Sequence, residues 1–311
     1  MNVPLHIVTP LIQSARLSQP DARIWLKMEA LQPAGSFKNR GIGHACQHYI
    51  SQGAKRLISS SGGNAGIATA YSGQKLGVPV IVIVPESTST EATDAMRMFG
   101  AAVTVHGHSW LEAHQHAESL LDQTSVLIHP FDDPLLWPGH ATMIDEVLAA
   151  DCAPDAVVLS VGGGGLLSGV AQGLKNHNLE DTLIVAVETE GAASLAAAME
   201  ADELVMLDQI STIANTLGAK QVCANALDVV HSMNVYSHIV SDQQALTACK
   251  HFLNDHRILV EPACGAALAA IYDDSAILKD AREILVVVCG GMGVSIAQLE
   301  RWQQQLDRQN G

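Results

Sequence analysis

Short apolar runs rich in β-branched residues recur along the chain, and longer amphipathic stretches rich in Ala and Leu separate them. The runs read RIWLKME, KRLISSS, VPVIVIVPE, AAVTVHG, AVVLSVGG, LIVAVETE and EILVVVCGG. Continuous apolar runs of this kind are typical of strands buried on both faces, in parallel sheets that helices cover from either side. The pattern therefore predicts the α/β fold class.

Several of the predicted strands end in glycines or small polar residues. The three clearest cases are residues 59–63, 162–165 and 290–291. In open parallel sheets, a ligand binds beyond the carboxyl ends of the strands. We therefore expect these three loops to line one cleft, although they lie far apart in the sequence.

The size and composition of the chain narrow the possible functions. With 311 residues and 48% hydrophobic content, the chain is long enough for one large domain or two smaller ones. Its net charge of −15 would repel a phosphate backbone, which argues against a nucleic-acid partner. A negative surface does not argue against a small phosphate ligand, because backbone N–H groups and helix N-termini bind such groups locally.

The sequence contains no readable signal for export or membrane insertion. The N-terminus, MNVPLHIVTPLIQSARLS, lacks a basic start followed by an apolar run, and no segment approaches about 18 uncharged apolar residues. Single cysteines without a C-x-x-C pair argue against a disulfide framework and a zinc cluster. We therefore expect a protein of the reducing cytoplasm with no membrane partner. The cysteines are Cys46, Cys152, Cys223, Cys249, Cys264 and Cys289.

The segment QPAGSFKNRG places Lys38 after a Pro- and Gly-bearing turn, at an expected helix start. The positive end of a helix lowers the pKa of a nearby amine and increases the fraction of free, nucleophilic amine. Such a lysine suits Schiff-base chemistry. On this segment alone, a solvated lysine at a helix start is an equally good interpretation, because most lysines lie at the surface.

The segment SSSGGNAG follows a predicted strand and precedes a predicted helix. Consecutive backbone N–H groups at such a junction form a nest that binds anions. Ser61, Gly62, Gly63 and Asn64 are therefore candidates for binding a carboxylate, and the Asn64 side chain adds a donor and an acceptor. A tight turn would explain the glycines, but not the serines and the asparagine around them.

The segment VGGGGLLSG also leads from a predicted strand into a predicted helix. Four consecutive glycines lose much backbone entropy on folding, which is tolerated where a group must approach the main chain closely. A phosphate is the natural candidate for residues 162–165. A Rossmann dinucleotide site is the weaker interpretation. The segment matches G-x-G-x-x-G poorly, and Glu188, the acidic residue that would bind a ribose hydroxyl, does not end a clear βαβ unit.

Cysteine and histidine side chains offer two further candidates. Cys289 follows the run VVV at the carboxyl end of a predicted strand, where it is either a functional thiol or a small buried apolar residue. His106, His108, His114 and His116 invite a metal interpretation. Their i, i+2 spacings would place them on different faces of one helix, so solvated surface histidines are the better interpretation.

Together these segments resemble the fold-type II pyridoxal phosphate (PLP) enzymes, the tryptophan synthase β-like family, and most closely its serine/threonine dehydratases of the animal serine dehydratase-like kind. The resemblance runs through QPAGSFKNRGIGH, SSSGGNAGIATAY, LGVPVIVIVPEST, PFDDPLLWPGHA, SVGGGGLLSGV, ILVEPACGAALAAIY and VVVCGG, in that order. It implies two three-layer α/β/α domains with largely parallel sheets and PLP in the cleft between them. Residues 1–38 and 136–311 would form the large PLP-binding domain, and residues 39–135 a small inserted domain.

The resemblance also implies a role for individual residues. Lys38 would form the Schiff base with PLP, Phe37 would lie against its ring, and Cys289 would face the pyridine nitrogen. Asn64 would hydrogen-bond the ring hydroxyl, and with Ser61, Gly62 and Gly63 it would bind the substrate carboxylate. The cofactor phosphate would be bound by Gly162, Gly163, Gly164, Gly165 and Leu166. A monovalent cation such as K+ would have its ligand positions at Gly162, Glu188, Ala192, Leu217 and Ala219.

The reaction implied by the resemblance is the deamination of L-serine to pyruvate and ammonia, through β-elimination of water, and of L-threonine to 2-oxobutyrate. Gly62 argues against racemisation, because serine racemases of this fold have a serine hydroxyl at this position. Many close dehydratases have alanine there, so a slightly looser substrate pocket is expected here.

Two alternatives remain open at this point. One is a β-replacement enzyme of the same fold, such as a cysteine synthase, and the other is a PLP-binding protein that has no catalytic activity. In each case the partner is a small amino acid. A homodimer is expected from family analogy alone.

Overall fold

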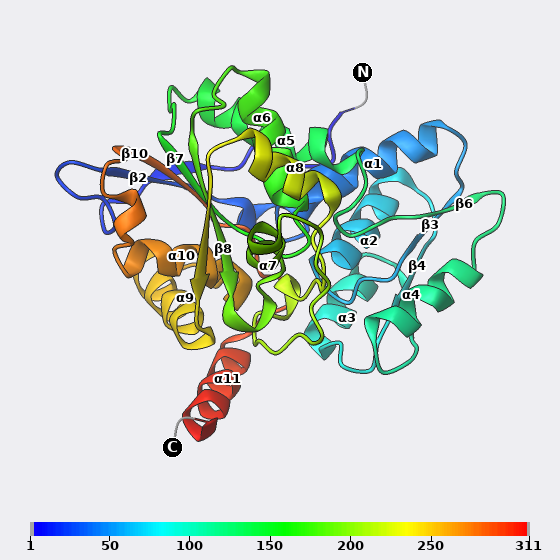
Figure 1. Ribbon diagram of the computed structural model, residues 1–311. Helices are drawn as coiled ribbons and strands as arrows, with labels where there is room; N and C mark the ends of the chain where they lie inside the picture. Colours follow the sequence, from blue (N-terminus) through cyan, green and yellow to red (C-terminus); the bar gives the residue numbers. More distant parts are fainter. Residues whose placement is uncertain (1–2, 310–311) are drawn as a thin grey trace.

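The computed structural model describes residues 3–309, which form two sheets covered by helices (Figure 1). The larger sheet contains β1 (Leu11–Gln13), β2 (Arg23–Lys27), β7 (Ala156–Ser160), β8 (Leu183–Thr189), β9 (Val235–Val240) and β10 (Glu283–Val287). The smaller sheet contains β3 (Arg56–Ser59), β4 (Val80–Val84), β5 (Ala102–Val105) and β6 (Ser125–Leu127). The strand orders are β1-β2-β10-β7-β8-β9 and β5-β4-β3-β6. All neighbouring strands are parallel except β1 and β2, so the predicted α/β class is confirmed.

Helices lie on both faces of the two sheets. They are α1 (Lys38–Ser51), α2 (Asn64–Leu76), α3 (Thr90–Met98), α4 (Trp110–Ser119), α5 (Leu136–Ala149), α6 (Gly165–Asn176), α7 (Ser194–Ala201), α8 (Ala224–Ser232), α9 (Asp242–His256), α10 (Pro262–Tyr272) and α11 (Ile296–Gln309). Short 3-10 helices are η1 (Glu29–Leu31), η2 (Glu190–Ala192), η3 (Asn215–Leu217) and η4 (Ala276–Leu278). Around the larger sheet, Figure 1 shows α5 and α6 on one side and α9 and α10 on the other. Among residues 3–309, no helix has the length and apolar character needed to cross a bilayer.

Two successive residues of β3 show that helices cover both faces of the smaller sheet. Leu57 belongs to a core that includes Ala65 and Ile67 of α2, whereas the next residue, Ile58, packs with Ala113 of α4. Because successive side chains of a strand point to opposite faces of the sheet, α2 and α4 cover opposite faces. The four strands of this sheet all come from residues 56–127. The domain boundaries at 38/39 and 135/136 remain a prediction.

The seven apolar runs in the sequence each contain a strand, and the strands that the pattern missed are β1, β6 and β9. All three lie at the edge of a sheet. An edge strand has one neighbour and is less buried, so it does not need a continuous apolar run. The burial of β9 illustrates this, because only its last residue, Val240, is fully buried.

A network of buried ionic side chains joins α1 to β2, η1 and α5. Arg40 is fully buried, and its guanidinium donates to both carboxylate oxygens of Glu29, at 2.7 and 2.8 Å, and to both of Glu146, at 2.7 Å each. Lys27 donates to Glu146 at 2.5 Å and to the carbonyl oxygen of Thr9 at 2.7 Å. Two cations and two anions are therefore paired in one hydrogen-bonded network. The planar guanidinium of Arg40 is well suited to bind two carboxylates in this way. This network fixes the first turn of α1.

We expect the substitution Arg40→Met to lower the free energy of unfolding by about 3–5 kcal/mol, because Glu29 would remain as a buried charge without its partner. Urea unfolding followed by circular dichroism measures this change. The matched control is Arg97→Met, since Arg97 forms a surface pair with Asp94 at 3.3 Å. Loss of such a pair costs less than about 1 kcal/mol. An effect of Arg40→Met no larger than that of the control would show that the network does not stabilise the fold.

Candidate active site

The loop after β10 is bonded directly to the segment that carries Lys38. Ser36 and Gly290 form an isolated antiparallel bridge, and the N–H of Phe37 donates to the carbonyl oxygen of Cys289 at 2.9 Å. Gly290 has a φ of +152°, and a Cβ atom at this position would lie 2.5 Å from the Cβ of Ser36. Glycine is therefore required for this close approach of the two main chains.

The other two strand-end loops reach the same region through residues 216, 217 and 261. The Nδ2 of Asn64 donates to Glu261 at 2.6 Å, and the N–H of Glu261 donates to the carbonyl oxygen of Gly290 at 3.2 Å. A Cβ atom on Gly63 would lie 3.2 Å from Thr216, and one on Gly162 would lie 3.0 Å from the Cα of residue 217. The structure thus brings the three loops together.

Lys38 is the first residue of α1, as the sequence predicts, and its side chain is partly buried. Its Nζ donates to the carbonyl oxygen of Pro130 at 2.5 Å. Burial lowers the pKa of this amine to about 8, although Cys223, Cys289 and Glu261 act in the opposite direction. A large fraction of the amine is therefore unprotonated at a slightly basic pH, which suits a nucleophile. The alternative of a solvated surface lysine does not agree with this environment.

Phe37 packs its ring against a buried histidine on α5. The ring centroids of Phe37 and His140 lie 5.0 Å apart, and the Nζ of Lys38 lies 5.0 Å from the Phe37 centroid. Burial, together with the charges of Lys38 and Arg40, holds the pKa of His140 well below its usual value. The Nδ1 of His140 accepts the N–H of Gly41 at 3.2 Å, so this neutral imidazole fixes the first turn of α1.

The loop between β3 and α2 has the strand–loop–helix geometry that the sequence predicts. The N–H of Gly63 donates to the hydroxyl of Ser61 at 3.3 Å, so this N–H group of the nest already has an acceptor within the loop. In the part of the chain that the structure describes, the N–H groups of Gly62 and Asn64 have no protein acceptor. These two groups are among those available to bind a carboxylate.

The space beside Gly62 is occupied by a threonine from the loop after β4. A Cβ atom on Gly62 would lie 2.3 Å from the hydroxyl oxygen of Thr88 and 3.0 Å from its methyl group. Such contacts require Thr88 to move. Thr88 therefore takes the place that a side chain at residue 62 would fill, and the expectation of a looser substrate pocket at this position stays a prediction.

The glycine loop after β7 is packed tightly between other parts of the chain. A Cβ atom on Gly163 would lie 2.2 Å from the ring of Phe131, and one on Gly164, which has a φ of +88°, would lie 2.5 Å from Ala226. Protein neighbours therefore account for these glycines without a ligand. The N–H groups of residues 163–166, at the start of α6, have no acceptor among residues 3–309. Four unpaired N–H groups at a helix N-terminus form a site suited to a phosphate.

Cys289 is almost fully buried at the carboxyl end of β10. A hydrogen bond with Cys264 and burial both raise the pKa of Cys289 well above its usual value. The thiol is therefore neutral at physiological pH. This environment agrees with a neutral group and excludes a reactive thiolate.

Of the residues expected around a monovalent cation, Gly162 and Leu217 lie next to each other. A Cβ atom on Gly162 would lie 3.2 Å from the carbonyl oxygen of Leu217. Both carboxylate oxygens of Glu188 accept N–H groups at the start of α7, from Leu195 at 2.7 Å and Ala196 at 2.8 Å. Burial raises the pKa of Glu188 to about 7, against the effect of these two bonds.

The four neighbouring histidines do not share one helix. His106 and His108 precede α4, and within residues 3–309 no group of three or more His, Cys, Asp or Glu side chains is arranged to hold a metal ion. The expectation of solvated histidines is wrong for His114, whose side chain is only 16% exposed. Its Nδ1 lies 2.9 Å from the hydroxyl of Ser60 and supports the loop after β3.

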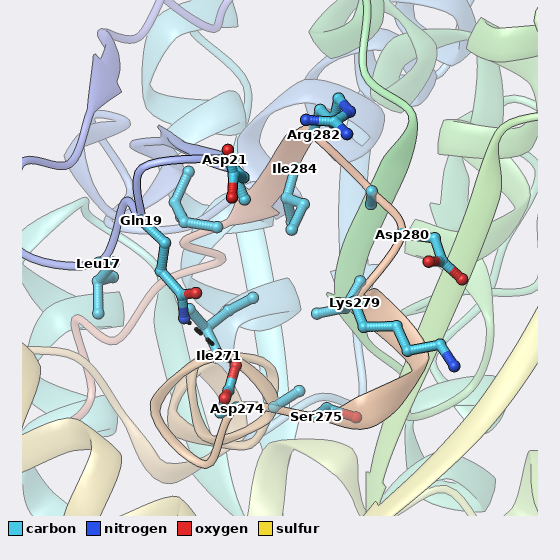
Figure 2. A pocket seen from close by; sticks show the side chains of 15 residues that line it. Leu17, Gln19, Asp21, Ile271, Asp274, Ser275, Lys279, Asp280, Arg282 and Ile284 are labelled. Carbon is cyan, nitrogen blue, oxygen red and sulfur yellow. Dashed lines mark hydrogen bonds between the residues drawn. The ribbon is translucent and has the colours of Figure 1, made fainter.

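A surface hollow lies away from this site, at the amino end of β10. Figure 2 shows Asp21, Asp274, Lys279 and Arg282 around it, with a hydrogen bond of 3.3 Å from Gln19 to Asp274. Its rim carries charges of both signs and does not include Lys38 or a strand-end glycine loop. Ligands of open parallel sheets bind at the opposite, carboxyl ends of the strands.

Several residues of the site were not singled out in the sequence. They contribute a carbonyl oxygen, a hydroxyl, an imidazole or a carboxylate, and each becomes visible only when distant segments meet. Glu261 alone carries a local signal, because it is an acidic residue within the apolar segment ILVEPACG. The residues are Thr88, Pro130, His140, Thr216 and Glu261.

Comparison with known proteins agrees with this geometry. A family model described as "Pyridoxal-phosphate dependent enzyme" matches residues 4–290. The "Serine dehydratase-like" protein of Rattus norvegicus is 45% identical, over 98% of this chain and 96% of the relative. The "L-serine dehydratase/L-threonine deaminase" of Homo sapiens is 42% identical, over 99% of this chain and 97% of the relative.

Solved structures give the same result. A fungal L-serine ammonia-lyase from Rhizomucor miehei superimposes with a TM-score of 0.92 at 34% identity, over 96% of this chain and 98% of that chain. Maize serine racemase superimposes with a TM-score of 0.87 at 25% identity, over 99% of this chain and 95% of that chain. The strand-end loops, the amine of Lys38 and these matches lead to one conclusion: the chain belongs to the family of pyridoxal-phosphate dependent enzymes.

Proposed function

We propose that the chain deaminates L-serine to pyruvate and ammonia by β-elimination of water, and L-threonine to 2-oxobutyrate in the same way. The observation that carries this proposal is the amine of Lys38, which lies where three strand-end loops meet and has a pKa of about 8. Relatives named serine dehydratase-like or L-serine dehydratase/L-threonine deaminase align over nearly the whole chain and support this substrate class. They favour dehydration over the cysteine synthase alternative.

We propose that residues of all three loops hold the cofactor. Lys38 would bind the aldehyde of pyridoxal phosphate, and the unpaired N–H groups of residues 163–166 would bind its phosphate. Phe37, supported by His140, would lie against the ring, and the neutral thiol of Cys289 would face the ring nitrogen. Asn64 donates to the ring hydroxyl. The support for this arrangement is the match between the unpaired donors of these loops and the polar groups of the cofactor.

Bound pyridoxal phosphate stabilises the negative charge that develops when an α-proton is removed from the amino acid. The Nζ of Lys38 is the group of the chain that accepts this proton, because a pKa of about 8 leaves part of the amine free near neutral pH. The N–H groups of Gly62 and Asn64 orient the substrate carboxylate. A neutral Cys289 would not hold a proton on the ring nitrogen as a carboxylate does, and this would favour prompt elimination over transamination.

We further propose a K+ site at Gly162, Glu188, Ala192, Leu217 and Ala219. In its support, the carbonyl oxygens of Gly162, Ala192 and Ala219 accept no hydrogen bond within residues 3–309. Backbone carbonyls and a carboxylate are ligands that suit such a hard cation. A homodimer in the cytoplasm completes the proposal, and the six free cysteines agree with a reducing compartment.

The direct test is the production of keto acids by the purified, PLP-loaded protein. We expect pyruvate from L-serine and 2-oxobutyrate from L-threonine without added sulfide, measured with a coupled dehydrogenase assay. Lys38→Ala should lower the rate by at least about 100-fold, because it removes the general base. Lys175→Ala is the control, since Lys175 lies exposed on α6 and bonds Ser232 at 2.9 Å.

Two outcomes of this assay would reject the proposed function. A product that forms only when sulfide is supplied would identify a β-replacement enzyme. Bound cofactor with no keto acid from either amino acid would identify a protein without catalytic activity.

The substitution Gly62→Ala tests whether Thr88 fills the space beside residue 62. The new methyl group would displace the hydroxyl of Thr88, and overpacking of this kind costs about 1–3 kcal/mol, so we expect kcat/KM for L-serine to fall about tenfold. The double variant Gly62→Ala/Thr88→Ala removes the two clashing atoms and should recover most of the activity. Activity of Gly62→Ala equal to or above that of the parent would instead support a loose pocket at this position.

A further inference from the structure

Glu261 is a buried carboxyl group that the reaction described above does not use. It immediately precedes α10 and is 7% exposed. Its N–H donates to the carbonyl oxygen of Gly290 at 3.2 Å, and its own carbonyl oxygen accepts the N–H groups of Cys264 and Gly265 at 2.9 Å each. The main chain of Glu261 is therefore fixed to the loop that contacts the Lys38 segment.

One oxygen of this carboxyl group accepts two hydrogen bonds from distant parts of the chain. The Oε1 accepts from the Nδ2 of Asn64 at 2.6 Å and from the hydroxyl of Thr216 at 2.9 Å. The methyl group of Thr216 lies 3.2 Å from the place that a Cβ on Gly63 would take. Glu261 thus holds both Asn64, which belongs to the proposed carboxylate nest, and Thr216, which lies beside Gly63 of that nest.

The chemistry of a carboxylate decides which way the Asn64 amide points. An amide side chain has a donor end and an acceptor end, whereas an ionised carboxylate only accepts. The NH2 end of Asn64 must therefore face Glu261, and its second hydrogen remains available to another acceptor. Burial raises the pKa of Glu261, while the bonds from Thr216 and Asn64 and the nearby charge of Lys38 act in the opposite direction and favour the ionised form.

We propose that Glu261 is a positioning residue that sets the orientation of the Asn64 amide, so that Asn64 presents its nitrogen, and not its oxygen, to the ring hydroxyl of pyridoxal phosphate. This inference rests on the proposed role of Asn64 toward the cofactor. Without the acceptor at Glu261, the amide can rotate and offer an oxygen to the hydroxyl. The electronic environment of the bound cofactor and its affinity would then change, even before any substrate is added.

The matched pair Glu261→Gln and Glu261→Met tests this inference, because the three side chains are similar in size and Gln keeps an acceptor oxygen whereas Met does not. We expect Glu261→Met to shift the visible absorbance of the bound cofactor and to weaken pyridoxal phosphate binding about tenfold. Glu261→Gln should shift both less than Glu261→Met, because its side chain can offer Asn64 an oxygen or an NH2 group and so fixes the amide only in part. Both are measured on the resting holoenzyme, by absorbance and by titration of the apoenzyme with pyridoxal phosphate.

A double variant separates positioning from a general loss of structure. If Glu261 acts through Asn64, the shifts of Glu261→Met and Asn64→Ala will not add in the double variant, because both remove the same interaction. Additive shifts, a Met variant with the spectrum and affinity of the parent, or a Gln variant whose shifts exceed those of Met would each overturn the inference. Failure of the proposed function is distinguishable, since it would appear as a parent protein that makes no keto acid.

Discussion

The position of the reactive amine depends on the buried charges around Arg40. Lys38 begins α1, and Arg40 lies two residues later with each of its two carboxylate partners bound through both oxygens. Glu29 lies in η1 and Glu146 on α5, so the first turn of α1 is held from two sides. Buried charges are stable only when they are paired and hydrogen-bonded, and a shift of α1 would break several of these bonds together. The network therefore fixes the position of Lys38 relative to the larger sheet.

The same rigidity explains how this lysine acquires its chemistry. Lys38 extends from a fixed helix start into surroundings where its amine loses solvation, and burial lowers its pKa to about 8. Lys27 is also buried, but it is bound by Glu146 and the carbonyl oxygen of Thr9. The structural Lys27 and the reactive Lys38 thus differ in the acceptors that are hydrogen-bonded to the amine. Lys38 has a carbonyl oxygen as its hydrogen-bond partner, and no carboxylate is bonded to it in the described residues.

Main-chain groups make many of the close contacts around Lys38. The bridge between Ser36 and Gly290, and the glycines of residues 162–165, allow backbone segments to pass at distances that side chains would prevent. The unpaired N–H groups of these loops provide local positive potential. This explains how a chain with a net charge of −15 can belong to a family that binds a phosphorylated cofactor.

The sequence predicts those parts of the molecule that local physics determines. Interior strands appear as continuous apolar runs, and the loops at their carboxyl ends are found from glycines, whereas the edge strands β1, β6 and β9 lack such a signal. Contacts between distant segments are not predictable in this way. Arg40 and Glu146 are 106 positions apart, and Asn64 and Glu261 are 197 apart. The filling of the space beside Gly62 by Thr88 is hidden from the sequence for the same reason.

The central claim is that Lys38 carries the cofactor. Reduction of the PLP-loaded protein with borohydride, followed by peptide mapping, locates the lysine that was bound to the aldehyde. We expect one pyridoxyl group, on the peptide that contains Lys38. A label on Lys27, the other lysine with a pKa lowered by burial, or the absence of any label would contradict the claim.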